Sequence, residues 1–162
     1  AAHRARPGGG VPDRGPAVTV RLDDAAEPDL PHLAAILSDW IDETPWMPRL
    51  HTRDENEGFL RMLAAGHVLR VARLNGAPAG FLARRDGEVD ALYLAPGARG
   101  QGLGAALLAE AKAARDALGL WTFQANVGAR AFYAREGFAE TRLTDGAEND
   151  ERLPDVRLEW RR

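Results

Sequence analysis

Three glycines at alternate positions form the segment of the sequence most suited to chemistry. Arg99-Gly100-Gln101-Gly102-Leu103-Gly104 lies between a predicted strand that ends at Leu94 and a predicted helix that begins at Leu103. Glycine has no Cβ, so its backbone can approach another molecule closely. The helix that follows directs its first free N–H groups and the positive end of its dipole back at this turn. The segment therefore predicts a pyrophosphate cradle, and with it a phosphate-bearing cofactor.

The position of these glycines and the residues that follow them argue against two common phosphate-binding motifs. A dinucleotide-binding G-x-G-x-x-G is expected after a first strand in an alternating βαβ unit, whereas these glycines follow a series of predicted hairpins. No Gly-Lys-Ser/Thr follows them, which excludes a P-loop. A plain tight turn remains the alternative to the cradle, although each glycine would then cost conformational entropy without a function.

The elements that must position this turn are predicted from apolar periodicity and turn residues, in the order β-α-α-β-β-β-α-β-α-β-β. Asn75-Gly76 and Asp86-Gly87 are predicted hairpin turns. Gly119 is predicted to end the helix that follows the glycine turn. The predicted strands are Val18–Leu22, His67–Leu74, Pro78–Arg84, Glu88–Leu94, Trp121–Gln124, Phe138–Leu143 and Val156–Trp160. The predicted helices are Pro28–Trp40, one opened by the capping box Thr52–Glu55, Leu103–Leu118 and Ala129–Glu136.

Composition limits the class of protein. A chain of 162 residues, 45% hydrophobic and 28% charged, predicts one soluble globular domain, here residues 18–162. The net charge of −3 argues against nucleic acid as a partner, and no apolar run is long enough for a membrane span. The absence of cysteine excludes disulfides, cysteine-bound metal and a thiol-linked acyl-enzyme, and agrees with the cytoplasmic location that we expect. The histidines at 3, 32, 51 and 67 have no metal-ligand spacing, so no metal is expected.

Residues 1–17 differ in composition from the rest of the chain. They contain four glycines, three prolines and three arginines, and almost no large apolar side chains. A signal peptide requires an apolar segment that is missing here. We expect a disordered tail, an upstream extension or a cloning remnant, with a basic nucleic-acid-binding arm as the alternative.

Two sequence blocks resemble the GCN5-related N-acetyltransferases (GNATs). Leu92-Tyr93-Leu94-Ala95-Pro96 followed by Arg99–Gly104 looks like the family's motif A, with its R/Q-x-x-G-x-G/A pattern. Asn126, Ala129, Phe132-Tyr133 and Gly137-Phe138 match the family's motif B, N-x-x-A-x-x-F-Y-x-x-x-G-F. The order of elements also matches the family from residue 18 to residue 160. The resemblance implies a GNAT-like α+β fold, in which helices cover both faces of a mixed, mostly antiparallel sheet that splays between its fourth and fifth strands.

The resemblance also implies acetyl-CoA as co-substrate and assigns residues to it. Main-chain N–H groups of Arg99, Gly100, Gln101, Gly102, Leu103 and Gly104 would hold the pyrophosphate. The strand Leu92-Tyr93-Leu94 would lie beside the pantetheine arm, with main-chain groups of Leu92 and Leu94 paired to it as if to an added strand. Asn126 would lie on the other side of the arm. Ala129 and Tyr133 share a helix face with each other, next to Phe132, and the small side chain of Ala129 would leave room for the cofactor.

Acetyl transfer from a thioester to an amine needs a proton donor for the leaving thiolate. The resemblance places the Tyr133 phenol for this role, although a half-buried packing residue is the alternative. An amine that arrives charged also needs a base. Period two places Glu88 and Asp90 on one strand face with Leu92 and Leu94, and either carboxylate could act directly or through water. Either could equally be a residue that only flanks the turn, and an amine that binds neutral would need no base.

The acceptor is expected to contact the loop Thr44–Pro48, which is unusually apolar. Trp46 and Met47 are the predicted substrate-binding residues, and a core role for Trp46 is the alternative. Asp39, Asp42 and Glu43 could attract a cationic amine, or they could form a solvated helix end. Small-molecule and peptide amines both remain open as acceptors, and the terminal strands could pair in a homodimer.

The resemblance implies an acetyl-CoA-dependent N-acetyltransferase, and the absence of cysteine favours direct transfer in a ternary complex. A non-catalytic acyl-CoA-binding regulatory module on the same fold is the first alternative, and the presence of Tyr133 argues against it. An enzyme that uses a dinucleotide is the second alternative.

Overall fold

The computed structural model describes residues 18–162, so the predictions for residues 1–17 lie outside it. The described residues form one seven-stranded sheet with the strand order β1-β2-β3-β4-β5-β7-β6. The strands are β1 Val20–Asp24, β2 Val68–Leu74, β3 Ala77–Arg85, β4 Glu88–Leu94, β5 Ala117–Phe123, β6 Ala139–Thr144 and β7 Asp155–Arg161. Only β4 and β5 are parallel neighbours within this sheet. The predicted α+β class, with a mixed and mostly antiparallel sheet, is confirmed.

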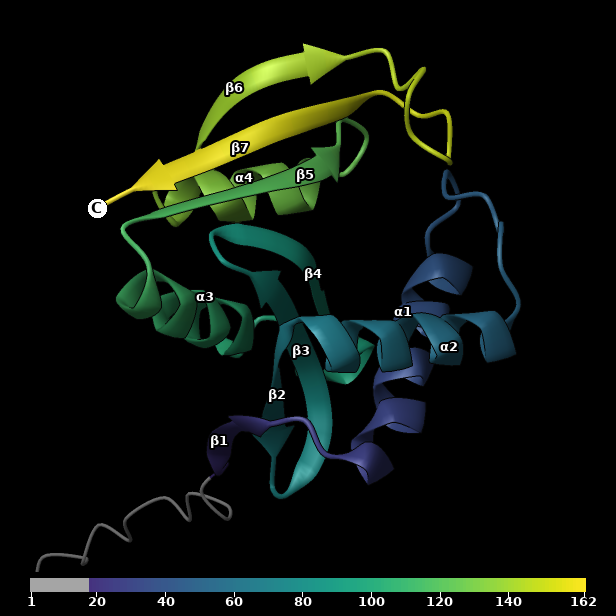
Figure 1. Cartoon of the computed structure of the whole chain (residues 1–162), viewed down its shortest axis with the longest axis vertical. Coiled ribbons are helices and arrows are strands. Elements are labelled where there is room, and N and C mark those ends of the chain that lie inside the picture. Colours follow the sequence, from purple (N-terminus) through teal and green to yellow (C-terminus); the bar gives the residue numbers. More distant parts are fainter. Residues whose placement is uncertain (1–17) are drawn as a thin grey trace, which may run out of the picture.

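Helices cover both faces of the sheet (Figure 1). On one face α1 and α2 pack over β2, β3 and β4, and on the other face α3 packs over the same strands. The helices span α1 Leu30–Glu43, α2 Arg53–Gly66, α3 Leu103–Ala114 and α4 Val127–Arg135, with short 3-10 turns at Glu27–Asp29 and Pro96–Ala98. The predicted order of helices and strands is confirmed. No helix within residues 18–162 has the length and apolar character that crossing a membrane requires.

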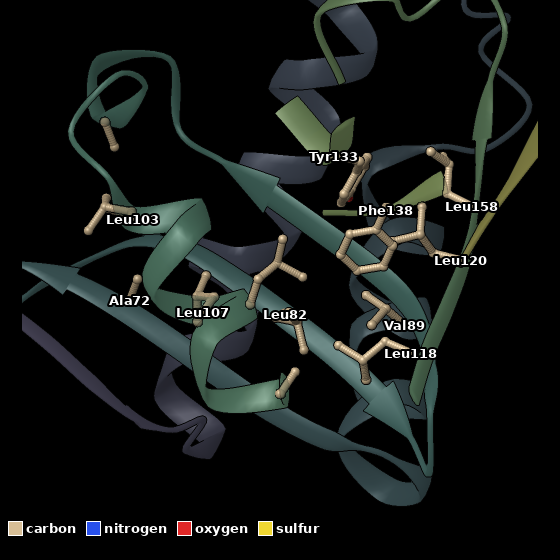
Figure 2. Packing of buried hydrophobic residues seen from close by; sticks show 14 of the residues in the cluster. Ala72, Leu82, Val89, Leu103, Leu107, Leu118, Leu120, Tyr133, Phe138 and Leu158 are labelled. Atoms are coloured by element: carbon tan, nitrogen blue, oxygen red, sulfur yellow. The ribbon is translucent and has the colours of Figure 1, made fainter. Parts of the chain in front are cut away.

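Two hydrophobic clusters fill the space between the helices and the sheet. Phe81 of β3 is fully buried in the cluster beneath α1 and α2, whereas its neighbour Leu82 points into the cluster beneath α3. In Figure 2, Leu107 of α3 lies over Leu82, and Tyr133 lies near Phe138 on the side of β5. The α3 cluster therefore extends across β4 to α4 and joins the two halves of the sheet.

The two predicted hairpin turns and the predicted capping box are confirmed. Both hairpin turns have left-handed residues, with φ of 51° at Asn75 and 52° at Asp86. The Thr52 hydroxyl accepts a hydrogen bond from the Glu55 N–H, and the Glu55 carboxylate accepts one from the Thr52 N–H, both at 3.1 Å. This capping box begins α2 where the sequence placed it.

The predicted extent of the helix after the glycine turn is wrong. α3 ends at Ala114, and Leu118 and Gly119 belong to β5. Leu118 is buried as a residue of strand β5, and its spacing matches the apolar stripe of the helix only by coincidence. Gly119 does not end a helix. A Cβ at Gly119 would overlap the guanidinium of Arg157, so a side chain at this strand position would have to displace Arg157 from its present place.

The predicted alternation along β4 is also wrong, because a β-bulge interrupts it. Ala83 of β3 pairs with Ala91 and the next residue, Arg84, pairs with Val89, which leaves Asp90 without a partner on β3. Val89 packs into the α3 cluster together with Leu92, whereas Ala91 packs into the α1–α2 cluster. Glu88 and Asp90 are therefore out of step with Leu92 and Leu94, and the four side chains do not share one face.

Candidate active site

A cavity of about 720 Å³ lies where the two halves of the sheet separate. β4 and β5 pair at a single position, Glu88 with Gly119, where the Gly119 N–H donates to the Gly87 carbonyl at 2.9 Å. Beyond this pair the strands diverge, and the predicted splay between the fourth and fifth strands is confirmed. The walls of the cavity come from β4, the glycine turn, the start of α3, β5 and α4.

The glycine turn forms one end of this cavity. Gly100 and Gly102 have φ of 75° and 81°, in the left-handed region that favours glycine. Ala106 is the first residue whose N–H bonds within α3, to the Gly102 carbonyl at 3.0 Å. The N–H groups of Leu103, Gly104 and Ala105 therefore have no partner within the helix and are available to an anion. Such a turn fits a pyrophosphate.

The three glycines of the turn do not share one role. A Cβ built at Gly100 or Gly102 would meet nothing within 4 Å, so open space surrounds both positions. At Gly104 a Cβ would lie 3.1 Å from the ring of Phe132. Gly104 thus allows α3 to pack against α4, and only the first two glycines keep the turn open to a ligand.

The open edge of β4 forms the cavity's long wall. The Ala95 N–H donates to the Ala79 carbonyl at 2.7 Å, so the main-chain groups of Ala95 and, by alternation, Tyr93 point toward β3. Those of Leu92 and Leu94 consequently point toward the gap between β4 and β5. An extended arm bound there would pair with Leu92 and Leu94 as an added strand does.

The N-terminal half of α4 forms the opposite wall. The Asn126 side chain caps this helix by accepting a hydrogen bond from the Ala129 N–H at 3.0 Å. Asn126, Ala129, Phe132 and Tyr133 all line the cavity. Ala129 contributes only a methyl group at the point where a bound molecule would pass.

Tyr133 lies at the junction of the cavity and the α3 cluster, with 7% of its surface exposed. Its ring packs edge-on against Phe138, with ring centroids 5.5 Å apart (Figure 2). It also packs against the ring of Phe132, with ring centroids 5.2 Å apart. Burial raises the pKa of the Tyr133 phenol well above its usual range, and the nearby Tyr93 adds to the rise. The phenol is therefore protonated at neutral pH and has a proton available to donate.

Glu88 and Asp90 have different environments. Arg157 of β7 donates to both carboxylate oxygens of Glu88, at 2.6 and 2.8 Å, and Glu88 is not among the residues that line the cavity. Asp90 lines the cavity and has its Oδ2 2.7 Å from Nε2 of His67. Of the two predicted base candidates, only Asp90 faces the space where an amine and a thioester could meet.

Aromatic side chains form a wall between α1 and β5. Trp40 packs against Tyr93 with ring centroids 5.2 Å apart. Trp46 lies between Trp40 and Phe123, and its ring centroid is 5.9 Å from that of Trp40 and 5.7 Å from that of Phe123. Burial raises the pKa of Tyr93 to about 12, with a further contribution from the charge of Glu151. Trp46 thus lies behind two residues that line the cavity, Trp40 and Phe123, without lining it itself.

A second cavity of about 600 Å³ shares Trp121, Thr122 and Phe123 with the first. The loop between β6 and β7 forms its other wall. Its ionisable lining residues are four carboxylates and one guanidinium, from Asp145, Glu148, Glu151, Asp155 and Arg142. The surplus of carboxylates favours a cation over an anion there.

Most predicted cofactor residues meet at the first cavity. Those that line it are Leu92, Tyr93, Leu94, Arg99, Gly100, Gly102, Leu103, Gly104, Asn126, Ala129, Phe132 and Tyr133. Gln101 does not line the cavity, and its side chain instead donates to the Gly97 carbonyl at 2.9 Å and closes the turn.

Met47 of the predicted acceptor loop does not line the first cavity either. The carboxylates near that loop are engaged by arginines, Asp39 and Asp42 by Arg53, and Glu43 by Arg99.

Trp40, Phe123 and His67 are among the residues at or beside the cavity that were not predicted to have a role in the site. Trp40 and Phe123 line it, and neither belongs to a motif. His67 contacts Asp90, yet 23 residues separate them in the chain. An apolar helix stripe that includes a tryptophan beside polar neighbours, Asp39 and Asp42, is the one local signal that could have drawn attention to Trp40.

Comparison with known proteins agrees with this geometry. The model of a family described as "Acetyltransferase (GNAT) family" matches residues 20–138. An uncharacterised N-acetyltransferase from Methanocaldococcus jannaschii is 34% identical over 92 residues, which cover 47% of this chain and 41% of that protein.

Solved structures share the fold at low sequence identity. Apo YjaB from Escherichia coli has a TM-score of 0.73 at 24% identity, covering 88% of this chain and 97% of its own. A GCN5-related N-acetyltransferase from Rhodopseudomonas palustris has a TM-score of 0.74 at 21% identity, covering 89% and 96%. Salmonella typhimurium yncA, solved with its cofactor acetyl-CoA, has a TM-score of 0.68 at 18% identity, covering 88% and 93%.

Proposed function

Because the chain belongs to the acetyltransferase (GNAT) family, we propose that it transfers the acetyl group of acetyl-CoA to a primary amine by direct attack in a ternary complex. The observation that carries this proposal is the meeting of three features in one cavity. An anion cradle, an open strand edge and a buried phenol, Tyr133, line it in succession. Each feature corresponds to one part of acetyl-CoA: its pyrophosphate, its pantetheine arm and its sulfur.

The residues present fit this co-substrate. The open space at Gly100 and Gly102 and the helix N-terminus suit the pyrophosphate, and the gap-facing main-chain groups of Leu92 and Leu94 suit the amide-bearing arm. When bound, acetyl-CoA supplies an activated acyl carbon and a thiolate leaving group. Tyr133 is the residue that would return a proton to sulfur.

Asp90 is the base that we propose. The amine nitrogen bonds to the acyl carbon, the carbon–sulfur bond breaks, one proton passes from nitrogen to Asp90, and one passes from Tyr133 to sulfur. Exchange with solvent restores both side chains. Glu88 is not proposed, because Arg157 engages both of its carboxylate oxygens. The pairing of an accessible carboxylate with a protonated phenol suits the two proton transfers of the reaction.

The second cavity supports a cationic amine as the acceptor. It adjoins the first across Trp121–Phe123, and carboxylates outnumber the guanidinium in its lining. A small-molecule or peptide amine that enters from this side would approach the splayed strands past Phe123. The presence of Asp90 and Tyr133 in the main cavity favours catalysis over a regulatory module that only binds acyl-CoA.

Release of free thiol from acetyl-CoA tests the proposal. The protein would be assayed with spermidine, free amino acids, an aminoglycoside and a short peptide with a free N-terminus, and the products would be identified by mass spectrometry. Thiol release that depends on an amine and equals the acetylated product supports the proposal. CoA binding without turnover across the panel would favour the regulatory module, and thermal stabilisation by NAD but not by CoA would favour a dinucleotide enzyme.

A further inference from the structure

His67 lies between α2 and β2 and is held there by its main chain. Its N–H donates to the Leu63 carbonyl at 2.8 Å, which caps the C-terminus of α2. Its side chain is only 10% exposed. From this position Nε2 reaches Asp90 Oδ2 at 2.7 Å, across β3. The contact therefore joins the end of α2 to the bulge of β4.

The hydrogen bond determines which ring nitrogen of His67 carries the proton. An ionised carboxylate only accepts hydrogen bonds, so Nε2 must donate. The other nitrogen, Nδ1, is buried and has no hydrogen-bond partner within residues 18–162. Burial of an unpartnered polar atom is unfavourable, and an apolar side chain of similar size would fill this space without that cost. Packing alone therefore does not explain a histidine here, whereas the bond to Asp90 does.

The environment of Asp90 does little to fix its side chain without this hydrogen bond. Asp90 is the unpaired residue of the β4 bulge, so no neighbour on β3 sets its register. Its side chain is 37% exposed at the edge of the cavity. The bond from His67 engages Oδ2 and leaves Oδ1 to accept a proton. Without that bond the carboxylate could occupy other staggered rotamers that aim it away from the amine.

We propose that His67 is a positioning residue that holds Asp90 for proton acceptance from the amine. This inference rests on the proposed function, in which Asp90 is the base. His67 does not line the cavity, so it would act only through Asp90. Loss of its Nε2–H should therefore slow the chemical step and leave the binding of acetyl-CoA unchanged.

Glutamine and methionine form a matched pair of substitutions for the test. Both have similar length and volume, but only glutamine retains an N–H donor at its end. We expect His67→Met to lower kcat by about 10- to 100-fold, as misplacement of a catalytic group does, while KM for acetyl-CoA stays constant. His67→Gln should recover most of that loss. His32, an exposed histidine of α1 that does not line the cavity, provides the control variant His32→Met.

A double-mutant cycle separates positioning from a structural role. Asp90→Asn, His67→Met and the double variant would be assayed with the panel amine that the wild type acetylates fastest, after circular dichroism has shown each variant to be folded. If His67 acts through Asp90, then His67→Met causes no further loss in the Asp90→Asn background. Equal losses from His67→Met and His67→Gln, an additive double variant, or unchanged kcat in His67→Met would each overturn the inference.

The same cycle distinguishes failure of the inference from failure of the proposed function. A wild type that acetylates no panel amine overturns the proposed function and the inference with it. A wild type that is active but insensitive to Asp90→Asn overturns the choice of base. An active wild type that is sensitive to Asp90→Asn but not to His67→Met overturns the role of His67 alone.

Discussion

The Arg157 guanidinium donates hydrogen bonds to both carboxylate oxygens of Glu88, at 2.6 and 2.8 Å. This pair links β7 to β4 at the point where the strands begin to splay. The two strands are not neighbours, because β5 lies between them. The guanidinium reaches across β5 at Gly119, where a Cβ would overlap its present position. This pair therefore has a structural role at the point where the cavity begins.

The first prediction contrasts Glu88 with Asp90. Asp90→Asn should lower kcat by about 10²–10⁴-fold, because removal of a general base has effects of that size. Glu88→Gln should leave kcat nearly unchanged and reduce thermal stability only modestly, because its carboxylate is 37% exposed. Steady-state kinetics and thermal unfolding of both variants check this. The reverse ranking of the two kcat values would show that the base has been assigned to the wrong carboxylate.

The second prediction concerns the cradle. Gly102→Ala places a side chain at a φ of 81°, which costs L residues about 1–2 kcal/mol and should distort the turn. We expect the Kd for CoA to rise about tenfold or more, since 1.4 kcal/mol corresponds to a factor of ten. Gly97→Ala is the matched control, because Gly97 is exposed, has open space around it and lacks a left-handed φ. Isothermal titration calorimetry measures the Kd for CoA of both variants. Equal Kd values would contradict the assignment of the glycine turn as the pyrophosphate site.

The third prediction uses the two tyrosines of the chain, Tyr93 and Tyr133. Burial raises the pKa of Tyr93 to about 12 and that of Tyr133 well above its usual range. Both phenols should therefore keep their protons in the folded protein until the pH is well above the ordinary tyrosine pKa of about 10. In urea, both should titrate near that ordinary value. Ultraviolet absorbance of phenolate during a pH titration checks this, and a native signal of half amplitude with a midpoint near pH 10 would contradict it.

The fourth prediction concerns stability at acid pH. Arg73 donates to both carboxylate oxygens of Asp29, each at 2.9 Å, and its hydrogen bonds lower the pKa of Asp29. A lowered pKa means that this stabilisation is present above the unfolded-state value of about 4 and is lost as the pH falls through the folded-state value. Asp29→Asn should cost about 1–3 kcal/mol at neutral pH, because Asp29 is only 7% exposed.

Urea unfolding at neutral pH and at about pH 3 measures this difference for the wild type and Asp29→Asn. The gap between the two proteins should shrink at the lower pH. Asp24→Asn is the control, because Asp24 also pairs with an arginine but is 85% exposed. A gap for Asp29→Asn that is the same at both pH values would contradict the lowered pKa.

The parts of the fold that could be predicted from the sequence are those that depend on short stretches of chain. Asn75-Gly76 and the capping box Thr52–Glu55 act within a few residues, so their signals do not depend on the rest of the fold. The predicted end of α3 was wrong because it depended on contacts with distant parts of the chain. Leu118 is buried by contacts of β5, and its spacing continues a helical pattern only by chance.

The parts of the site that escaped prediction depend on tertiary geometry. The bulge at Asp90 follows from the pairing of β4 with β3, and no local residue type marks it. It separates Asp90 from Leu92 in a way that simple alternation cannot anticipate. Trp40 and Phe123 meet the same cavity from α1 and β5, which come together only through the splay of the sheet. Motif spacing predicted most of the residues on the proposed cofactor side of the cavity, whereas the proposed acceptor side depends on residues that only the folded chain brings together.

The comparison of Tyr133→Phe with the wild type tests the central claim most directly, namely that this cavity is where the acetyl group is transferred. The formation of acetylated amine and the Kd for CoA would be measured on both proteins. The wild type should form product in step with free thiol, and Tyr133→Phe should bind CoA equally well but turn over about 10²–10⁴-fold more slowly. Equal turnover by the two proteins, or no product from the wild type despite tight binding of CoA, would contradict the account.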